Sequence, residues 1–123
     1  MSWMLTVSKN PSKKQLRSLL QYYQAGRLND AEKLALSITQ QFPKHSYSWK
    51  VLSVLHKQAG RILEALAANQ KIVEITPLEA EAHYNLGNTL QELNRLDEAV
   101  VSYKQAITLN SNFAEAYNNL ANA

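Results

Sequence analysis

A six-residue pattern occurs three times in this 123-residue chain at a constant spacing. The copies begin at residues 26, 60 and 94 and read GRLNDA, GRILEA and NRLDEA. Consecutive copies start 34 residues apart, with no insertion or deletion between them. A fixed period of this length is typical of helical repeat arrays, in which each unit packs only on its neighbours. Such arrays usually bind other molecules, so the period favours a binding function over catalysis.

A second marker keeps the same phase. Pro43, Pro77 and Ser111 each lie twelve residues after the alanine that ends a copy of the pattern. The period therefore divides the chain into an N-terminal extension (1–11), three units (12–45, 46–79 and 80–113) and the first helix of a truncated fourth unit (114–123).

The third unit carries the clearest motif. It reads AEAHYNLGNTL from residue 80, followed by NRLDEA, Tyr103 and Ala106. This unit resembles the tetratricopeptide repeat (TPR), a helix–turn–helix unit of the same period. The residues that match its signature are His83, Leu86, Gly87, Leu90, Ala99 and Tyr103 in the third unit, Trp49, Leu52, Ser53, His56, Ala65 and Pro77 in the second, and Leu19, Tyr22, Ala31 and Pro43 in the first.

The first two units depart from that signature. Gln15 and Ser18 replace an aromatic residue and a leucine, and Asn69 stands where the second helix of a unit has an aromatic residue. Ile38 and Ile72 replace the small residue that Ala106 provides in the third unit. We expect wider helix spacing or altered tilt in these two units.

Apolar residues recur at helical spacing in every unit, and no alternating run competes as a strand. Gly26, Gly60 and Asn94 fall at the corners between helices, where a positive φ is favourable for glycine and tolerated by asparagine. The expected fold is all-α, a right-handed TPR superhelix of about 3.5 repeats. The helices are predicted at residues 12–25, 28–42, 46–59, 62–75, 80–93, 96–109 and 114–122.

Composition excludes several classes of protein. The absence of cysteine rules out disulfides, thiol nucleophiles and thiolate metal sites. No apolar stretch approaches the roughly 20 residues of a membrane span, and residues 1–7 are too short for a signal-peptide core, so we expect a cytoplasmic protein. His45, His56 and His83 lack metal-ligand spacing, and the three glycines form no phosphate-binding loop. The prediction is a non-enzyme without cofactor or metal, with His56 and His83 as packing residues.

Charge is distributed unevenly along the chain. Residues 1–45 hold seven Lys/Arg and two Asp/Glu, whereas residues 80–123 hold two and five. The basic first unit could attract an acidic partner or nucleic acid. A solvated helix face is the simpler interpretation, so nucleic-acid binding is not expected.

The first helix of each TPR lines a groove, and the resemblance implies which side chains face it. Asn85 and Asn119 share the sixth position of their units, and Asn88 and Asn122 share the ninth. A side-chain amide can pair with a peptide backbone through both a donor and an acceptor. These residues resemble the asparagine ladder of O-linked N-acetylglucosamine transferase arrays. The predicted peptide-binding residues are Asn85, Asn88, Asn119 and Asn122 for the backbone, with Tyr84, Lys50 and Lys57 for side-chain selectivity.

The sequence leaves several alternatives open. Leu16 and Leu20 stand where chaperone-tail receptors of this family carry polar residues that clamp a carboxylate, which disfavours binding of a partner's C-terminal carboxylate. The two leucines form either an apolar end of the groove or, more simply, part of the core. Trp3 either covers the first unit or belongs to a disordered tail. Because the chain ends within a fourth unit, we expect a fragment of a longer array. The predicted function is protein–protein interaction; the alternatives are the substrate-recruiting array of a larger enzyme such as a glycosyltransferase, and a scaffold that self-assembles through its incomplete last repeat.

Overall fold

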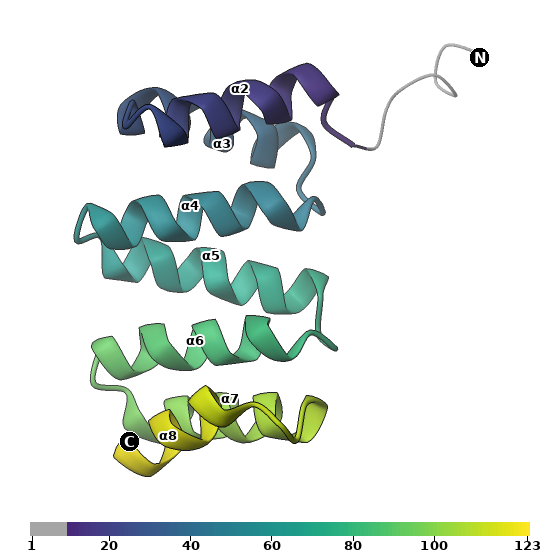
Figure 1. Cartoon of the computed structure of the whole chain (residues 1–123). Helices are drawn as coiled ribbons and strands as arrows, with labels where there is room; N and C mark the ends of the chain where they lie inside the picture. Colours follow the sequence, from purple (N-terminus) through teal and green to yellow (C-terminus); the bar gives the residue numbers. More distant parts are fainter. Residues whose placement is uncertain (1–9) are drawn as a thin grey trace.

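The computed structural model describes residues 10–123, and within them the regular structure is α-helical throughout. Figure 1 shows the helices stacked in chain order, each running back against the one before it. Each helix packs mainly on its neighbours in the chain, as in a solenoid. The helices are α2 (Lys13–Gln24), α3 (Leu28–Gln41), α4 (Ser46–Gln58), α5 (Ile62–Ile75), α6 (Ala80–Glu92), α7 (Leu96–Leu109) and α8 (Ala114–Asn122). The predicted ranges agree with these bounds to within a residue or two at each end, and the all-α solenoid is confirmed. None of these helices is long and apolar enough to span a membrane.

The corners between paired helices have the backbone conformation that the repeated pattern predicts. Gly26, Gly60 and Asn94 have φ angles of 74°, 77° and 59°. The left-handed conformation turns the chain directly from one helix into the next. Acidic residues then occupy the first turn of the following helix, near its positive end: Asp30, Glu64, Asp97 and Glu98.

The same hydrogen bond ties the second unit to the first and the third unit to the second. Trp49 Nε1 donates to the Pro43 carbonyl oxygen at 2.9 Å, and His83 Nε2 lies 2.8 Å from the Pro77 carbonyl oxygen. Both bonds join the fourth residue of a unit to the proline six residues earlier. In the first unit Gln15 takes that position, and its side chain instead completes a capping box with Ser12 at the start of α2. His83 is therefore more than a packing residue, because it fastens α6 to the preceding turn.

His56 also has a role beyond packing. It is 7% exposed, and its Nδ1 lies 3.5 Å from carboxylate oxygens of both Glu32 and Glu64. Arg61 forms ion pairs with the same two carboxylates. Glu32 belongs to α3 and Glu64 to α5, so this cluster links the first unit to the second.

The core is divided between the two ends of the array. One cluster joins the first two units through Leu19, Ala31, Ala35, Ile38, Leu52 and Leu55, and a second lies around Leu66, Leu90, Ala99 and Tyr103. The backbones of α6 and α7 lie close to each other at more positions than those of α4 and α5, and α2 and α3 do so at the fewest. This order has the direction expected for the two divergent units. In α8, Ala116 is fully buried and Leu120 packs on the second cluster, while Tyr117 stays 48% exposed. The prediction for Trp3 lies outside the described residues.

Candidate functional site

The helices α2, α4, α6 and α8 share one face of the stack, which we call the groove. Contacts between successive members define it. Gln58 Nε2 of α4 lies 3.4 Å from Tyr23 Oη of α2, Lys57 of α4 pairs with Glu92 of α6 at 2.9 Å, and Asn119 of α8 donates to Asn88 of α6 at 2.7 Å. The residues predicted to bind a peptide come from three of these helices.

An apolar pocket lies at the N-terminal end of the groove, between α2 and α4. It has a volume of about 230 Å³. Leu20, Tyr47 and Val54 are each 40% exposed or slightly more. The simpler prediction of a core role is therefore wrong for Leu20, which lines the groove as its counterpart Val54 does one unit later. The lining residues are Leu20, Tyr23, Tyr47, Lys50, Val51 and Val54.

A polar pocket of about 250 Å³ adjoins it, between α4, α5 and α6, and the two pockets share Lys50 and Val54. Asn69 and Ser53, which are 3% and 6% exposed, also line it. The Ser53 hydroxyl donates to Asn69 Oδ1 at 2.7 Å, and Asn69 Nδ2 donates to Thr89 Oγ1 at 2.6 Å. The sequence marked Asn69 only as a departure from an aromatic position. In the structure that departure opens a pocket with buried polar groups.

The amides further along the groove are joined to tyrosines. Asn119 Nδ2 donates to Asn88 Oδ1 at 2.7 Å and to Tyr84 Oη at 3.1 Å. The Tyr103 hydroxyl lies 2.7 Å from both Asn88 Oδ1 and Gln91 Oε1. Burial raises the pKa of Tyr103 above its ordinary value of 10.0, although its hydrogen bonding to Asn119 opposes the shift. The structure thus brings three predicted residues together, Tyr84, Asn88 and Asn119, in a network that orients their polar groups.

The remaining predicted residues lie at the edges of this network. Asn85 is exposed and lines the polar pocket, and Asn122 is exposed near the end of α8. Lys50 and Lys57 line the same pocket, and each forms an ion pair with a carboxylate in or directly before α6. Lys50 Nζ lies 3.0 Å from Glu79 and Lys57 Nζ lies 2.9 Å from Glu92. Both lysines are therefore oriented before any partner arrives.

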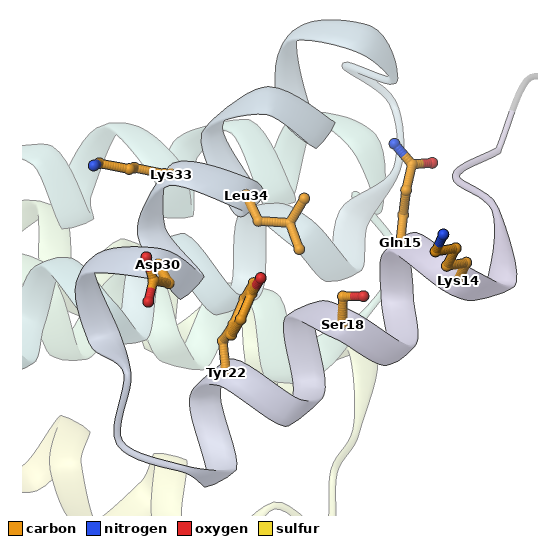
Figure 2. Close-up of a pocket in the computed structure, with 7 residues that line it drawn as sticks. All are labelled: Lys14, Gln15, Ser18, Tyr22, Asp30, Lys33 and Leu34. Atoms are coloured by element: carbon orange, nitrogen blue, oxygen red, sulfur yellow. The ribbon is translucent and has the colours of Figure 1, made fainter.

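A further hollow lies on the side of α2 that faces away from the groove. Figure 2 shows its lining, which comes from α2 and α3 and includes Tyr22, Asp30 and Leu34. Its volume is about 450 Å³. Gln15 and Ser18 stand here in the positions that Trp49 and Leu52 fill one unit later, so smaller and more polar side chains leave the space open. Among residues 10–123, no group of three or more His, Asp or Glu side chains is arranged to hold a metal ion.

Comparisons with known proteins agree with this geometry. Two models of the tetratricopeptide repeat match the chain, over residues 19–80 and 80–113. No curated protein matches it in sequence. Among solved structures, the first TPR of Spaghetti (RPAP3), bound to the HSP90 peptide SRMEEVD, is 18% identical, with a TM-score of 0.81 and 94% of each chain covered.

Two other folds are similar. A MamA structure is 20% identical with a TM-score of 0.81, covering 97% of this chain and 70% of MamA. The O-GlcNAc transferase of Thermobaculum terrenum (K341M mutant) is 26% identical with a TM-score of 0.72, and the match covers 88% of this chain but 21% of that one. At identities under 25%, the first two likenesses show the fold alone. The matching repeat models and the stacked helix pairs together show that the chain belongs to the tetratricopeptide repeat family.

Proposed function

We propose that this chain binds an extended segment of a partner protein along the groove. Tetratricopeptide repeats are typically protein-interaction modules, which supports the general class. The observation that carries the more specific proposal is the pair of adjoining pockets that share Lys50 and Val54, one apolar and one polar. An extended peptide presents successive side chains to alternate faces, so it can place side chains in neighbouring pockets and leave its backbone to the amides.

The asparagines would hold the peptide backbone. Asn88 uses its oxygen and Asn119 its nitrogen in their mutual bond, so each has the opposite group to offer: N–H donors on Asn88 and an acceptor on Asn119. Asn85 of α6 and Asn122 of α8 are both exposed. Tyr84, which bonds Asn119, and the two lysines would add contacts to partner side chains.

Affinity would come mainly from the apolar pocket. Full burial of one leucine, valine or phenylalanine side chain contributes roughly 1.5–3 kcal/mol. The backbone amides would fix the register and direction of the peptide rather than its sequence.

The test is a peptide-display selection on the wild-type chain, followed by affinity measurements on an Asn85→Ala/Asn119→Ala variant. We expect enriched peptides whose affinity falls about thirtyfold in the variant, because two amide contacts contribute roughly 1 kcal/mol each. Asn29→Ala is the matched control, since Asn29 is an exposed asparagine outside the groove. Selection of no peptide would contradict the proposal, and so would equal affinity of the selected peptides for the Asn85→Ala/Asn119→Ala variant and the Asn29→Ala control. Circular dichroism confirms that each variant is folded.

A second candidate follows from the O-GlcNAc transferase comparison. The chain spans 21% of that enzyme, so the same groove would recruit substrates for a larger protein with a catalytic domain. Sequencing the natural gene tests this candidate directly, because it requires a transferase domain encoded in the same reading frame. Self-association through α8 stays a separate prediction, which sedimentation over a range of concentrations would test.

A further inference from the structure

The polar pocket between α4 and α6 is the space that a tyrosine ring fills one repeat later. Residues 34 positions apart occupy the same place in successive units, so the two environments can be compared residue by residue. Lys50, Ser53, Val54, Lys57, Asn69 and Asn85 line the pocket, and they correspond to Tyr84, Gly87, Asn88, Gln91, Tyr103 and Asn119.

In the later repeat this space is filled from within the chain. The Tyr103 ring packs over Gly87, and a Cβ placed on Gly87 would lie 2.6 Å from Tyr103 Cε1. The Tyr103 hydroxyl reaches Asn88 and Gln91, each at 2.7 Å. Tyr103 is fully buried there.

In the earlier repeat the same space is open because its inner residue is short. Asn69 replaces the tyrosine, and Ser53, which replaces the glycine, bonds it at 2.7 Å. About 250 Å³ remains open toward the groove. This volume holds a side chain as well as solvent, since one water takes up about 30 Å³ of the liquid.

The lining indicates which side chain fits. Val54 and Ile72 contribute apolar groups, while the buried Asn69 and Ser53 offer a second lone pair and a hydroxyl. Lys50 and Lys57 are neutralised by Glu79 and Glu92, so the pocket does not select an anion. Glu81 also lines the pocket and disfavours a carboxylate. A neutral group with an apolar body and a polar tip meets these conditions.

We propose that the polar pocket receives a tyrosine side chain of the bound partner, so that the partner supplies the ring that the chain itself supplies through Tyr103 one repeat later. This inference rests on the proposed peptide-binding function. The ring enters from the groove, and its hydroxyl meets Asn69 and Ser53 at the buried end. The ring body lies beside Val54 and Ile72, with the lysine ammonium groups near its face.

The chain provides the template for the decisive variant. Ser53→Gly with Asn69→Tyr copies the Gly87–Tyr103 pair into the second repeat and fills the pocket from within. Lys57 stands where Gln91 meets the Tyr103 hydroxyl, so the new hydroxyl has a polar neighbour. Peptides selected on the wild-type chain should contain a tyrosine at one fixed position. In the filled variant that preference should disappear while the preferences at other positions remain.

A second variant keeps the inference testable if the filled one does not fold. Ser53→Ala with Asn69→Leu removes the polar end of the pocket. Peptides with phenylalanine in place of tyrosine should bind the wild-type chain about fivefold more weakly, because one neutral hydrogen bond is lost. This difference should vanish or reverse in the apolar variant.

The outcomes separate this inference from the general function. Enriched peptides without a fixed tyrosine, or with a tyrosine that both variants still prefer, would overturn the assignment of the pocket and leave peptide binding intact. Failure to enrich any peptide on the folded wild-type chain would overturn both.

Discussion

Gly87 and Tyr103 form a matched pair, in which the tyrosine ring occupies the space that any side chain at position 87 would need. The distance from an added Cβ to Tyr103 Cε1 is 2.6 Å, shorter than any relaxed contact between carbon atoms. The residues at the same positions of the earlier units are Ser53 with Asn69 and Leu19 with Ala35. As the first-helix residue grows from glycine to leucine, the second-helix residue shrinks from tyrosine to alanine. In the first and third units a large residue on one helix thus meets a small residue on the other, whereas Ser53 and Asn69 leave the polar pocket open.

Gly87→Ala should destabilise the fold by about 1–2 kcal/mol. Overpacking a core site costs roughly 1–3 kcal/mol, and the gain in helix propensity from glycine to alanine returns about 0.5–1 kcal/mol. Urea unfolding followed by far-ultraviolet circular dichroism measures the change. Asn85→Ala, an exposed change on the same helix, should stay within about 0.5 kcal/mol of the wild type. A Gly87→Ala protein as stable as the wild type would show that the ring moves aside freely.

Gly60→Ala should cost about 1–2 kcal/mol for a different reason. Beyond Gly60 and its two chain neighbours, no atom lies within 4 Å of the added Cβ, so tertiary packing does not oppose the change. The cost comes from the φ angle of 77°, where a Cβ approaches the following carbonyl oxygen. Gly60→Asn should cost less than Gly60→Ala, because Asn94 holds φ 59° at the equivalent corner. Equal losses in the two variants, measured by thermal unfolding, would argue against a backbone origin.

Trp49→Phe should lower the free energy of unfolding by about 1 kcal/mol. It removes the 2.9 Å bond from Nε1 to the Pro43 carbonyl oxygen while keeping an aromatic ring in place. Trp49→His should recover part of the loss, since His83 makes the equivalent bond to Pro77 in the next unit. If phenylalanine and histidine are equally destabilising in urea titrations, the hydrogen bond is not the cause.

Tyr103 should make the fold sensitive to alkaline pH. Burial raises the pKa of Tyr103 in the folded chain, whereas in the unfolded chain the tyrosine ionises near its ordinary pKa of 10.0. The unfolded state therefore loses its proton first, and stability falls as the pH rises above about 10. Tyr103→Phe should be less stable at pH 7, because the bonds to Asn88 and Gln91 are lost, but its stability should fall less steeply above pH 10.

Melting temperatures of both proteins between pH 7 and 11 check this prediction. Lysines also lose their charge in this range, and the Tyr103→Phe protein keeps them all, so the difference between the two curves isolates the tyrosine. Parallel curves would show that Tyr103 does not contribute to the alkaline loss.

The fold can be predicted from the sequence because the residues that specify it act locally and recur periodically. Gly26, Gly60 and Asn94 recur at one spacing, and each needs only its own backbone angle to turn the chain. Small residues such as Ala31, Ala65 and Ala99 mark close helix contacts, and all three are fully buried. A pattern repeated three times allows each unit to support the assignment of the others.

The shape of the candidate site, in contrast, depends on how the helices pack. The sequence placed Asn88 and Asn119 on the groove, but it did not show that they bond each other or that Tyr103 joins them. Those contacts link residues 15 to 31 positions apart, and their distances depend on how the units stack. The same is true of Asn69, whose replacement of an aromatic residue predicts only wider helix spacing or altered tilt. Only the packed helices show an open pocket there, because the volume of a pocket depends on how side chains from several helices pack around it.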